Sequence, residues 1–423
     1  MSARVLRAKH SHPIMSIPRL VILACALATT AFANDWPQWR GPDRSDISKE
    51  TGLLKEWPAE GPKQTWIFKD AGKGYSGPAI VGGKLFTLGT RDGKEIILSL
   101  DAATGKELWA RPVGDILGNR WGNGPRGTPT FDGGKVYALS GTGVLACVSA
   151  ADGNEVWTTK MSDVGGGVPG WGYTESPLVD GNQVVVTPGG GKGAIAAFDK
   201  ATGKLMWQSK DFTDGAQYSS IVPATINGEK QYVQLTMQSV VGISPKDGAV
   251  LWKQPFPGRT AVIPTPIVKD NQVYVTAGYG AGCMALKIEP ENKVSVAYSN
   301  TVMKNHHGGV ILVGDYLYGH SDGNGWVCQD WKSGEQKWNE KSKLGKGAIG
   351  YADGMFYCLD EGSGTVMLVE ASPNGWNEKG RFKLDPQTAI RSSQGRIWTH
   401  PVIVNGNLYL RDQDLIYCYS VKK

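Results

Sequence analysis

Several short segments of the sequence combine aromatic, basic and acidic side chains more densely than a connecting loop requires. They read "GNRWGNGPRGTP", "GGGVPGWGYTESP", "DGAQYSSIVP", "GRTAVIPTP", "MKNHHGG" and "SSQGRIWTHP". Indole and phenol rings stack on flat ligands and sugars, and a guanidinium group binds a carboxylate through two parallel hydrogen bonds. The same side chains anchor peptides at interfaces. The candidate binding residues are therefore Trp121, Arg126, Trp171, Tyr173, Glu175, Tyr218, Arg259, His306, His307, Trp398 and His400.

The pair His306–His307 is the most suggestive metal-binding pattern in the chain. Adjacent residues on a strand point to opposite faces, however, and cannot easily hold one ion. No cysteine or carboxylate stands at zinc-ligand spacing from the pair. The stretch "SDGNG" (321–325) resembles part of a calcium loop but lacks the terminal glutamate, and no Gly-x-Ser-x-Gly motif occurs. The sequence therefore predicts neither a metal site nor a catalytic set.

A repeated phrase indicates which elements must position the candidate residues. Residues 101–109 read "DAATGKELW", and similar phrases end at Trp207, Trp252 and Trp338. In the unit that covers 78–109, short apolar runs are separated by Gly-Gly, Asp-Gly and Asp-x-x-x-Gly turns, which favours four short antiparallel strands. Units of this kind that recur every 40–50 residues or so are typical of the blades of a β-propeller.

The two ends of the chain predict how the ring of blades closes. The last unit begins at Pro401 and stops after three strands, whereas "PKQTWIFK" is a fourth-strand sequence without a blade. We therefore expect the strand of Trp66 to complete the last blade. The predicted fold is all-β, an eight-bladed β-propeller of four-stranded antiparallel blades in which N- and C-terminal strands share one blade. An aromatic residue marks each blade, at positions 66, 109, 157, 207, 252, 298, 338 and 382.

In a propeller of this kind, the candidate residues are expected to lie close together. Their segments join the outermost strand of one blade to the innermost strand of the next, so they surround the mouth of the central channel. The predicted propeller domain covers residues 64–423. Residues 34–63, with Trp36, Trp39 and Trp57, form an irregular N-terminal strap that packs on the propeller. An arm that docks a partner is the alternative interpretation of the strap.

Residues 1–33 have the pattern of a signal peptide. Basic residues precede the apolar run "LVILACALATTAFA", and Ala31-Phe32-Ala33 fits the cleavage rule, with Met15 as an alternative start. We therefore expect an exported protein, periplasmic or extracellular, without a transmembrane span and without a lipid anchor on Cys25. The cysteines of the mature chain are interpreted as small core residues. They are Cys147, Cys283, Cys328, Cys358 and Cys418.

Charge and composition restrict the expected partners. The chain has 45 basic and 39 acidic residues, a net charge of +6, spread in short alternations without a basic arm. Nucleic acid is therefore not an expected partner. We expect a monomer that binds a protein, a small molecule or a glycan at the channel mouth.

Residues 100–109, "LDAATGKELW", resemble the repeat of the quinoprotein-type propeller family, and the resemblance extends over about residues 64–423. The stretch "DWPQWRGPDRS" (35–45) is similar to the start of exported members of this family, some of which are named polyvinyl-alcohol dehydrogenases. The family includes dehydrogenases that use pyrroloquinoline quinone (PQQ) with calcium, and BamB-like scaffolds of outer-membrane protein assembly. The resemblance implies the propeller fold and leaves both kinds of function open.

The motifs that hold the quinone and the calcium in such dehydrogenases, and the haem in those with an added haem site, have no counterpart here. The sequence has no adjacent Cys-Cys pair and no Cys-x-x-Cys-His motif, and Glu175 does not match the calcium-binding glutamate in position. We therefore interpret the protein as a binding or scaffold protein that acts through its aromatic- and Arg-rich channel-mouth face, with no assigned catalytic residue or cofactor. A PQQ-dependent alcohol or sugar dehydrogenase with calcium is the alternative, and a glycan-binding propeller is a third hypothesis.

Overall fold

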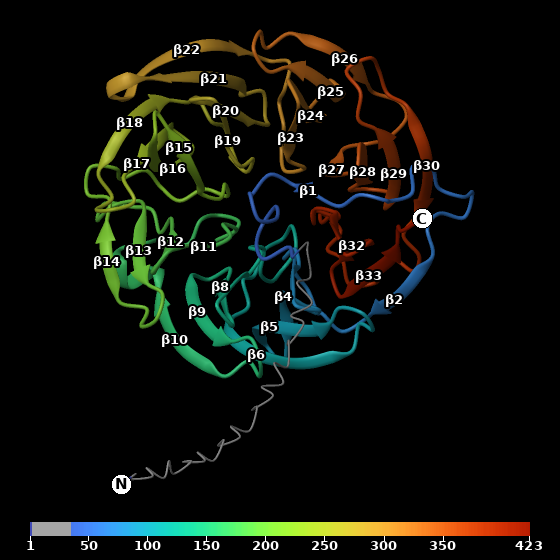
Figure 1. The fold of residues 1–423 in the computed structure, drawn as a ribbon, viewed down its shortest axis with the longest axis horizontal. Coiled ribbons are helices and arrows are strands. Elements are labelled where there is room, and N and C mark those ends of the chain that lie inside the picture. Colours follow the sequence, from blue (N-terminus) through green and yellow to red (C-terminus); the bar gives the residue numbers. More distant parts are fainter. Residues whose placement is uncertain (2–34) are drawn as a thin grey trace. The chain divides into compact units, whose positions relative to one another are not determined.

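The computed structural model describes Met1 and residues 35–423, and within this part the chain forms eight β-sheets arranged in a ring (Figure 1). The predicted signal peptide, including Met15 and Cys25, lies outside the described residues. Each sheet contains four antiparallel strands in a simple up-and-down order, and one of the sheets gains a further short strand. The prediction of an all-β, eight-bladed propeller is confirmed.

The first four blades follow one another along the chain. Their strands are β3 (Ala79–Val81), β4 (Lys84–Arg91), β5 (Lys94–Asp101) and β6 (Glu107–Asp115); β7 (Thr130–Asp132), β8 (Lys135–Leu139), β9 (Val144–Ser149) and β10 (Glu155–Lys160); β11 (Leu178–Asp180), β12 (Gln183–Val186), β13 (Ala196–Asp199) and β14 (Leu205–Gln208); β15 (Val222–Ile226), β16 (Glu229–Leu235), β17 (Ser239–Ile243) and β18 (Val250–Pro255). A short 3₁₀ turn, η1 (Met161–Val164), follows β10.

The last four blades continue in the same way. Their strands are β19 (Ile267–Lys269), β20 (Gln272–Ala277), β21 (Gly282–Glu289) and β22 (Lys293–Asn300); β23 (Val310–Val313), β24 (Tyr316–Ser321), β25 (Gly325–Asp330) and β26 (Gln336–Glu340); β27 (Gly347–Ala352), β28 (Met355–Asp360), β29 (Thr365–Glu370) and β30 (Glu378–Lys383); β31 (Val402–Val404), β32 (Asn407–Asp412), β33 (Leu415–Ser420) and β2 (Gln64–Phe68). A second 3₁₀ turn, η2 (Pro290–Asn292), joins β21 to β22.

Ring closure occurs where the sequence predicts it. Strand β2 pairs antiparallel with β33, and Trp66 lies opposite Cys418. The indole nitrogen of Trp66 donates to the carbonyl oxygen of Ala102 in the first blade, 3.1 Å away. The N-terminal strand thus completes the last blade, and its tryptophan connects that blade to the first one. A closed ring has no terminal blade with an uncovered face.

The repeated Asp-x-x-x-Gly-x-x-x-Trp phrase is explained by contacts between neighbouring blades. Asp101 accepts a hydrogen bond from the backbone nitrogen of Thr104 at 2.9 Å, which closes the turn. Gly105 has a φ of 71°, and a β-carbon there would lie 2.6 Å from the Trp66 ring of the preceding blade. Glycine is therefore required both by the backbone conformation and by the packed indole. The same contact joins Gly153 to Trp109, so the phrase builds the ring and needs no ligand.

The N-terminal strap inserts a plug into the central channel. Strand β1 (Ile47–Ser48) pairs parallel with β27, and the backbone of Trp36 exchanges two hydrogen bonds of 2.7 Å with Ile80 on β3. Between these contacts, residues 36–48 lie in the middle of the ring, where Figure 1 shows the segment that leads to β1. The stretch 35–45 that resembles exported family members is thus the part of the strap that fills the channel.

Two buried arginines fix this plug to several blades. Arg44 donates to the carbonyl oxygens of Pro177 at 2.6 Å and Ile221 at 2.8 Å, at the start of the third and fourth blades. Arg40 donates to the carbonyl oxygen of Val310 in the sixth blade at 2.6 Å and forms an ion pair with Asp46 at 2.8 Å. Burial lowers the pKa of Arg44 to about 10, although nearby Glu175 opposes this effect.

The five cysteines of the described chain form no disulfide bonds. Cys147, Cys283, Cys328, Cys358 and Cys418 are buried with free thiols, and burial raises the pKa of the Cys147 and Cys418 thiols to about 11. No helix within the described residues is long and apolar enough to cross a lipid bilayer.

Candidate functional site

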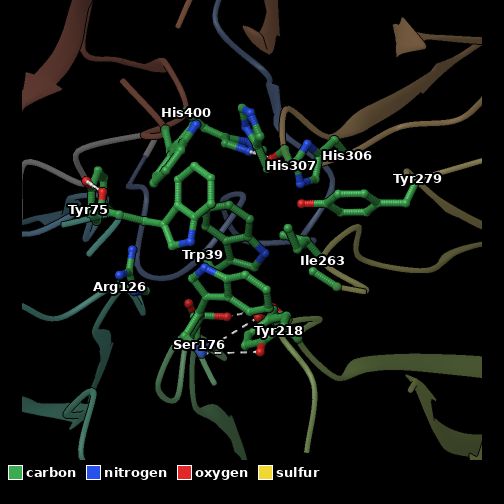
Figure 2. Close-up of a pocket in the computed structure, with 16 residues that line it drawn as sticks. Trp39, Tyr75, Arg126, Ser176, Tyr218, Ile263, Tyr279, His306, His307 and His400 are labelled. Carbon is green, nitrogen blue, oxygen red and sulfur yellow. Dashed lines mark hydrogen bonds between the residues drawn. The ribbon is translucent and has the colours of Figure 1, made fainter. Parts of the chain in front are cut away.

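A cavity of about 180 Å³ opens at one mouth of the channel, directly above the plug (Figure 2). One water molecule needs roughly 10–15 Å³ of such space, so the cavity can hold an organic molecule. Figure 2 shows Tyr75 and Arg126 on one side and Tyr279 and His306 on the other, with the Tyr279 hydroxyl directed inward. The lining residues are Trp39, Tyr75, Trp121, Arg126, Trp171, Thr174, Ser176, Tyr218, Ser220, Ala261, Ile263, Tyr279, His306, His307, Trp398 and His400.

The lining comes mainly from the segments that join one blade to the next. Trp121 and Arg126 lie between β6 and β7, for example, and Trp398 lies between β30 and β31. Two residues come from elsewhere. Tyr279 lies in the hairpin between the second and third strands of its blade, and Trp39 belongs to the plug. In an up-and-down blade, the hairpin from second to third strand ends on the same face as the segment leading to the next blade, so both reach this mouth.

Most of the candidate residues from the sequence lie together in this cavity. Three of the candidates do not line it. Tyr173 is buried, and its hydroxyl donates to the carbonyl oxygen of Pro188 at 2.9 Å. Arg259 is exposed outside the cavity. The candidates that do line it are Trp121, Arg126, Trp171, Tyr218, His306, His307, Trp398 and His400.

Glu175 is the third candidate that lies away from the cavity. It is buried between blades, where its carboxylate accepts hydrogen bonds from the backbone nitrogen of Thr187 at 2.6 Å and from the Thr187 hydroxyl at 3.0 Å. Burial raises its pKa to about 7, although the bonds from Thr187 oppose this effect. The carboxylate is therefore engaged in packing the third blade and does not reach a ligand.

Sequence reasoning missed several lining residues. Trp39 was not placed at the mouth because the plug has no repeat pattern, and Tyr75, which lies in the connection from β2 to β3, was not singled out. Tyr279 lies in the glycine-rich hairpin "AGYGAG", and an aromatic residue inside such a turn is a usable signal. The remaining missed residues are small: Thr174, Ser176, Ser220, Ala261 and Ile263.

Arg126 is the cation of the cavity. Its Nη2 donates to the carbonyl oxygen of Gly122 at 2.7 Å, and its guanidinium carbon lies 4.8 Å from the centre of the Tyr75 ring. Its Nε is buried and has no hydrogen-bond partner among the described residues. Burial lowers the pKa of the Arg126 guanidinium, which neighbouring Tyr75 and Glu95 partly offset. No carboxylate forms an ion pair with Arg126 within this part of the chain.

Histidines form the opposite wall. The Nζ of Lys346 lies 2.5 Å from Nδ1 of His306 and 2.7 Å from Asp322. His307 pairs through Nε2 with the carboxylate of Glu361, which also accepts a hydrogen bond from the Trp398 indole at 3.0 Å. These contacts hold the two imidazoles in fixed orientations.

His400 connects this wall to the plug. Its Nδ1 lies 2.9 Å from Asp46, and its Nε2 lies 2.8 Å from the carbonyl oxygen of His307. The ring of Trp39 packs on the His400 ring at 4.6 Å, and the Trp39 indole donates to the Thr265 hydroxyl at 3.0 Å. The floor of the cavity is therefore built by the strap and fixed from two sides.

The lining does not fit PQQ with calcium. That cofactor carries several carboxylates, and calcium takes about six to eight oxygen ligands, usually with carboxylates among them. The cavity offers the guanidinium of Arg126 and no Asp or Glu side chain. No group of three or more potential metal-ligating side chains occurs within residues 35–423. We therefore derive no redox step at this site.

Comparison with known proteins identifies the repeat. Residues 92–340, more than half of the chain, match the sequence profile of a family described as outer membrane protein assembly factor BamB. No protein of curated function matches the sequence at a significant level.

Solved structures share the fold at low sequence identity. The chain is similar to BamB from Moraxella catarrhalis, with a TM-score of 0.61 and 14% identity over 85% of this chain and 99% of that one. It is also similar to quinohemoprotein alcohol dehydrogenase from Comamonas testosteroni, with a TM-score of 0.60 and 12% identity over 94% and 82% of the two chains. A computationally designed protein, Ika8, matches with a TM-score of 0.59 and 12% identity over 85% and 100%. Likeness at this level concerns the fold alone.

Proposed function

The chain belongs to the family described as outer membrane protein assembly factor BamB, and on that premise we propose that it is an exported binding protein. In this proposal, the cavity above the plug holds a small ligand or a side chain of a protein partner. The propeller supplies a rigid ring, and the unequal segments between its blades supply the recognition surface. This arrangement separates the repeated structural residues from the residues that bind.

The observation that carries the proposal is the convergence of aromatic rings on one cavity. Trp121, Trp171 and Trp398 come from three different blade connections, and Trp39 comes from the plug. Trp121, Trp171 and Trp398 are only partly buried, so each leaves ring surface available for contact. Grouping large, partly exposed rings in a concave site is typical of ligand and interface anchors. Of the blade tryptophans, Trp66, Trp109, Trp157 and Trp252 are buried, whereas Trp207 and Trp338 are partly buried.

A binding role also agrees with the state of the carboxylates. Glu175 lies away from the cavity and Glu361 contacts the lining residues His307 and Trp398, and both carboxylates accept hydrogen bonds from neighbouring protein groups. A general base needs a free lone pair within reach of the substrate. The lining supplies rings, hydroxyls and one guanidinium instead, which suits recognition better than proton transfer.

Titration of the tryptophan fluorescence tests this function. The purified mature protein is mixed separately with D-glucose, D-glucuronate, benzoate, benzamide and a capped tripeptide, and with PQQ plus calcium. We expect saturable fluorescence changes with at least one of the first five probes and no dye reduction with alcohols in the presence of PQQ. Saturable PQQ binding together with alcohol-dependent dye reduction would establish the dehydrogenase instead. A flat response to every probe would overturn the binding proposal.

Export needs a separate test. Residues 1–40 fused to alkaline phosphatase, which is active only after it leaves the reducing cytoplasm, should give phosphatase activity in a bacterial host. The same fusion without residues 1–33 is the control and should be inactive. Activity of the control alone, or of neither fusion, would contradict the export proposal.

A further inference from the structure

The side chains that reach the cavity are hydrogen-bond donors, and this one-sided chemistry limits what can bind. We propose, building on the binding function above, that the cavity selects a ring-bearing carboxylate: a uronic acid sugar or an aromatic acid. Both sources share a flat or chair-shaped ring and one carboxylate.

Arg126 supplies the charge. Its only hydrogen bond among the described residues is the one from Nη2 to the Gly122 carbonyl, and its Nε is buried without a partner. Arg126 is partly buried and forms no ion pair within residues 35–423, so a carboxylate that approaches its guanidinium group is favoured. Because its guanidinium carbon lies 4.8 Å from the centre of the Tyr75 ring, the ring holds it in place. A carboxylate can then meet an oriented donor.

Two buried serines supply hydroxyl donors. Ser176 Oγ accepts a hydrogen bond from the backbone nitrogen of Thr128 at 2.8 Å, and Ser220 Oγ accepts one from the backbone nitrogen of Ser176 at 3.0 Å. Both side chains are at least 97% buried and line the cavity. A hydroxyl group that accepts from a backbone N–H keeps its own proton for donation. Neither proton has an acceptor among the described residues, so each is available to a ligand oxygen.

Two tyrosine hydroxyl groups also offer hydrogen-bond donors to a ligand. Tyr218 accepts a hydrogen bond from the backbone nitrogen of Trp171 at 3.3 Å, so its proton is also free to be donated. The hydroxyl of Tyr279 has no hydrogen-bond partner among residues 35–423 and points into the cavity (Figure 2). Burial raises the pKa of both phenols, Tyr218 and Tyr279. They therefore remain protonated donors near neutral pH.

The tautomer of His306 is fixed by its neighbour. The ammonium group of Lys346 can only donate, so Nδ1 of His306 must accept and the ring proton lies on Nε2. This leaves another N–H donor on the wall opposite Arg126. The remaining histidine of this pair does not add an acceptor to the surface, because Nδ1 of His307 is buried and its Nε2 faces Glu361.

The lack of carboxylate and amide side chains and the presence of indole rings further restrict the ligand. No Asp, Glu, Asn or Gln side chain lines the cavity, so an ammonium compound would find only hydroxyl lone pairs and ring faces as acceptors and would face the positive charge of Arg126. The indoles of Trp121, Trp171 and Trp398 offer flat walls to a ring. A cavity of about 180 Å³ suits a single substituted ring better than a long chain. A cyclic acid can pair its carboxylate with Arg126, accept hydrogen bonds from the hydroxyl groups and pack its ring against the indoles.

Isothermal titration calorimetry with matched pairs tests this inference. Benzoate is compared with benzamide, and D-glucuronate with D-glucose, at one ionic strength. We expect at least one acid to bind ten times or more tightly than its neutral partner; the pair that shows this identifies the source. Arg126→Leu should remove that preference, whereas Arg259→Leu, which changes an exposed arginine outside the cavity, should keep it.

The outcomes separate this inference from the binding function on which it rests. If the acid and its neutral partner bind equally well and Trp171→Ala weakens both, the selection for charge is wrong and the binding function still holds. If none of the four probes binds, the ring-carboxylate proposal is wrong. The fluorescence titration with the capped tripeptide then still tests the binding function. If Arg126→Leu fails to fold, the acid-to-neutral ratio of the wild-type protein decides alone.

Discussion

The ammonium nitrogen of Lys346 lies 2.5 Å from Nδ1 of His306, so a lysine determines which nitrogen of a cavity histidine carries the proton. Burial, together with His307 and Lys346, lowers the pKa of His306 to about 3. The imidazole is therefore neutral throughout the physiological range and presents Nε2–H to the cavity. This fixed donor is part of a wall whose other members also donate.

The first prediction concerns this tautomer. In nitrogen-15 spectra of histidine-labelled protein, His306 should show a protonated Nε2 and an unprotonated Nδ1, and no titration between pH 8 and pH 4.5. The chain has 6 histidines, so His306→Gln suffices to assign the signal. Lys346→Met should raise the pKa of His306, because it removes a nearby positive charge. A His306 that titrates near pH 6.5 in the wild-type protein would contradict the assignment.

The second prediction concerns the pH dependence of stability at Glu175. Its folded-state pKa is raised to about 7 from 4.5, mainly by burial, so the folded protein prefers the protonated carboxyl. The resulting stabilisation is fully present below pH 4.5 and is lost as the pH rises to about 7, at a cost of about 3 kcal/mol at most. Glu175→Gln should remove this trend.

Denaturant unfolding at pH 5 and pH 7.5 measures the effect. The decrease in unfolding free energy between these two values should be smaller in Glu175→Gln than in the wild-type protein. His306 and His320, whose pKa values are lowered to about 3 and about 4, mainly by burial, act with the opposite sign as the pH falls below 6.5. They are common to both proteins and cancel in the comparison. An unchanged difference would show that Glu175 does not titrate in this range.

The third prediction concerns ring closure. Trp66 packs between the last and first blades and donates to Ala102. Trp66→Ala should lower the free energy of unfolding by about 3–5 kcal/mol, the usual cost of removing a buried indole. Trp66→Phe keeps the ring contact and loses one hydrogen bond, so it should cost less, about 1–2 kcal/mol. Urea denaturation followed by circular dichroism gives both values. Equal, small losses for the two variants would contradict the closing role of Trp66.

The fourth prediction concerns the plug. Arg44→Met leaves the carbonyl oxygens of Pro177 and Ile221 without their donor, which should cost at least about 2 kcal/mol. Amide hydrogen exchange of residues 36–48 should accelerate in this variant. Lys49→Met is the matched control, because Lys49 makes only an exposed ion pair with Asp43, and it should change stability by less than about 0.5 kcal/mol. Unaltered exchange in Arg44→Met would show that the plug is held by other contacts.

The sequence predicted the ring of blades in detail because the blades repeat. The turn glycine and the blade tryptophan recur for local reasons, a positive φ and a packed indole, so their pattern survives in the sequence. The place of the Trp66 strand in the last blade, where it pairs with β33, followed from a missing strand at one end and a surplus strand at the other. Such inferences need only the periodicity and the geometry of a closed ring.

The binding site was less predictable because its residues occur once. Their segments were placed at the channel mouth, yet the direction of each side chain depends on neighbours from other blades. Glu175 and Arg259 share segments with residues that line the cavity, but one turns inward to Thr187 and the other is exposed. Trp39 was assigned to a strap that packs on the propeller, because nothing in "DWPQWRGPDRS" shows that Arg40 and Arg44 find acceptors inside the channel.

Calorimetric titration of benzoate and D-glucuronate into the wild-type protein and Trp171→Ala decides whether the cavity binds a ligand. Trp171 lines the cavity, is partly buried and meets the Tyr218 ring in a T-shaped contact at a ring-centre distance of 5.7 Å, so its removal should leave the blades intact. We predict saturable binding to the wild-type protein and about tenfold to hundredfold weaker binding to Trp171→Ala, at unchanged melting temperature. Equal affinities in the two proteins would contradict a ligand site at the channel mouth, and no binding of either acid to the wild-type protein would contradict the selection of cyclic acids.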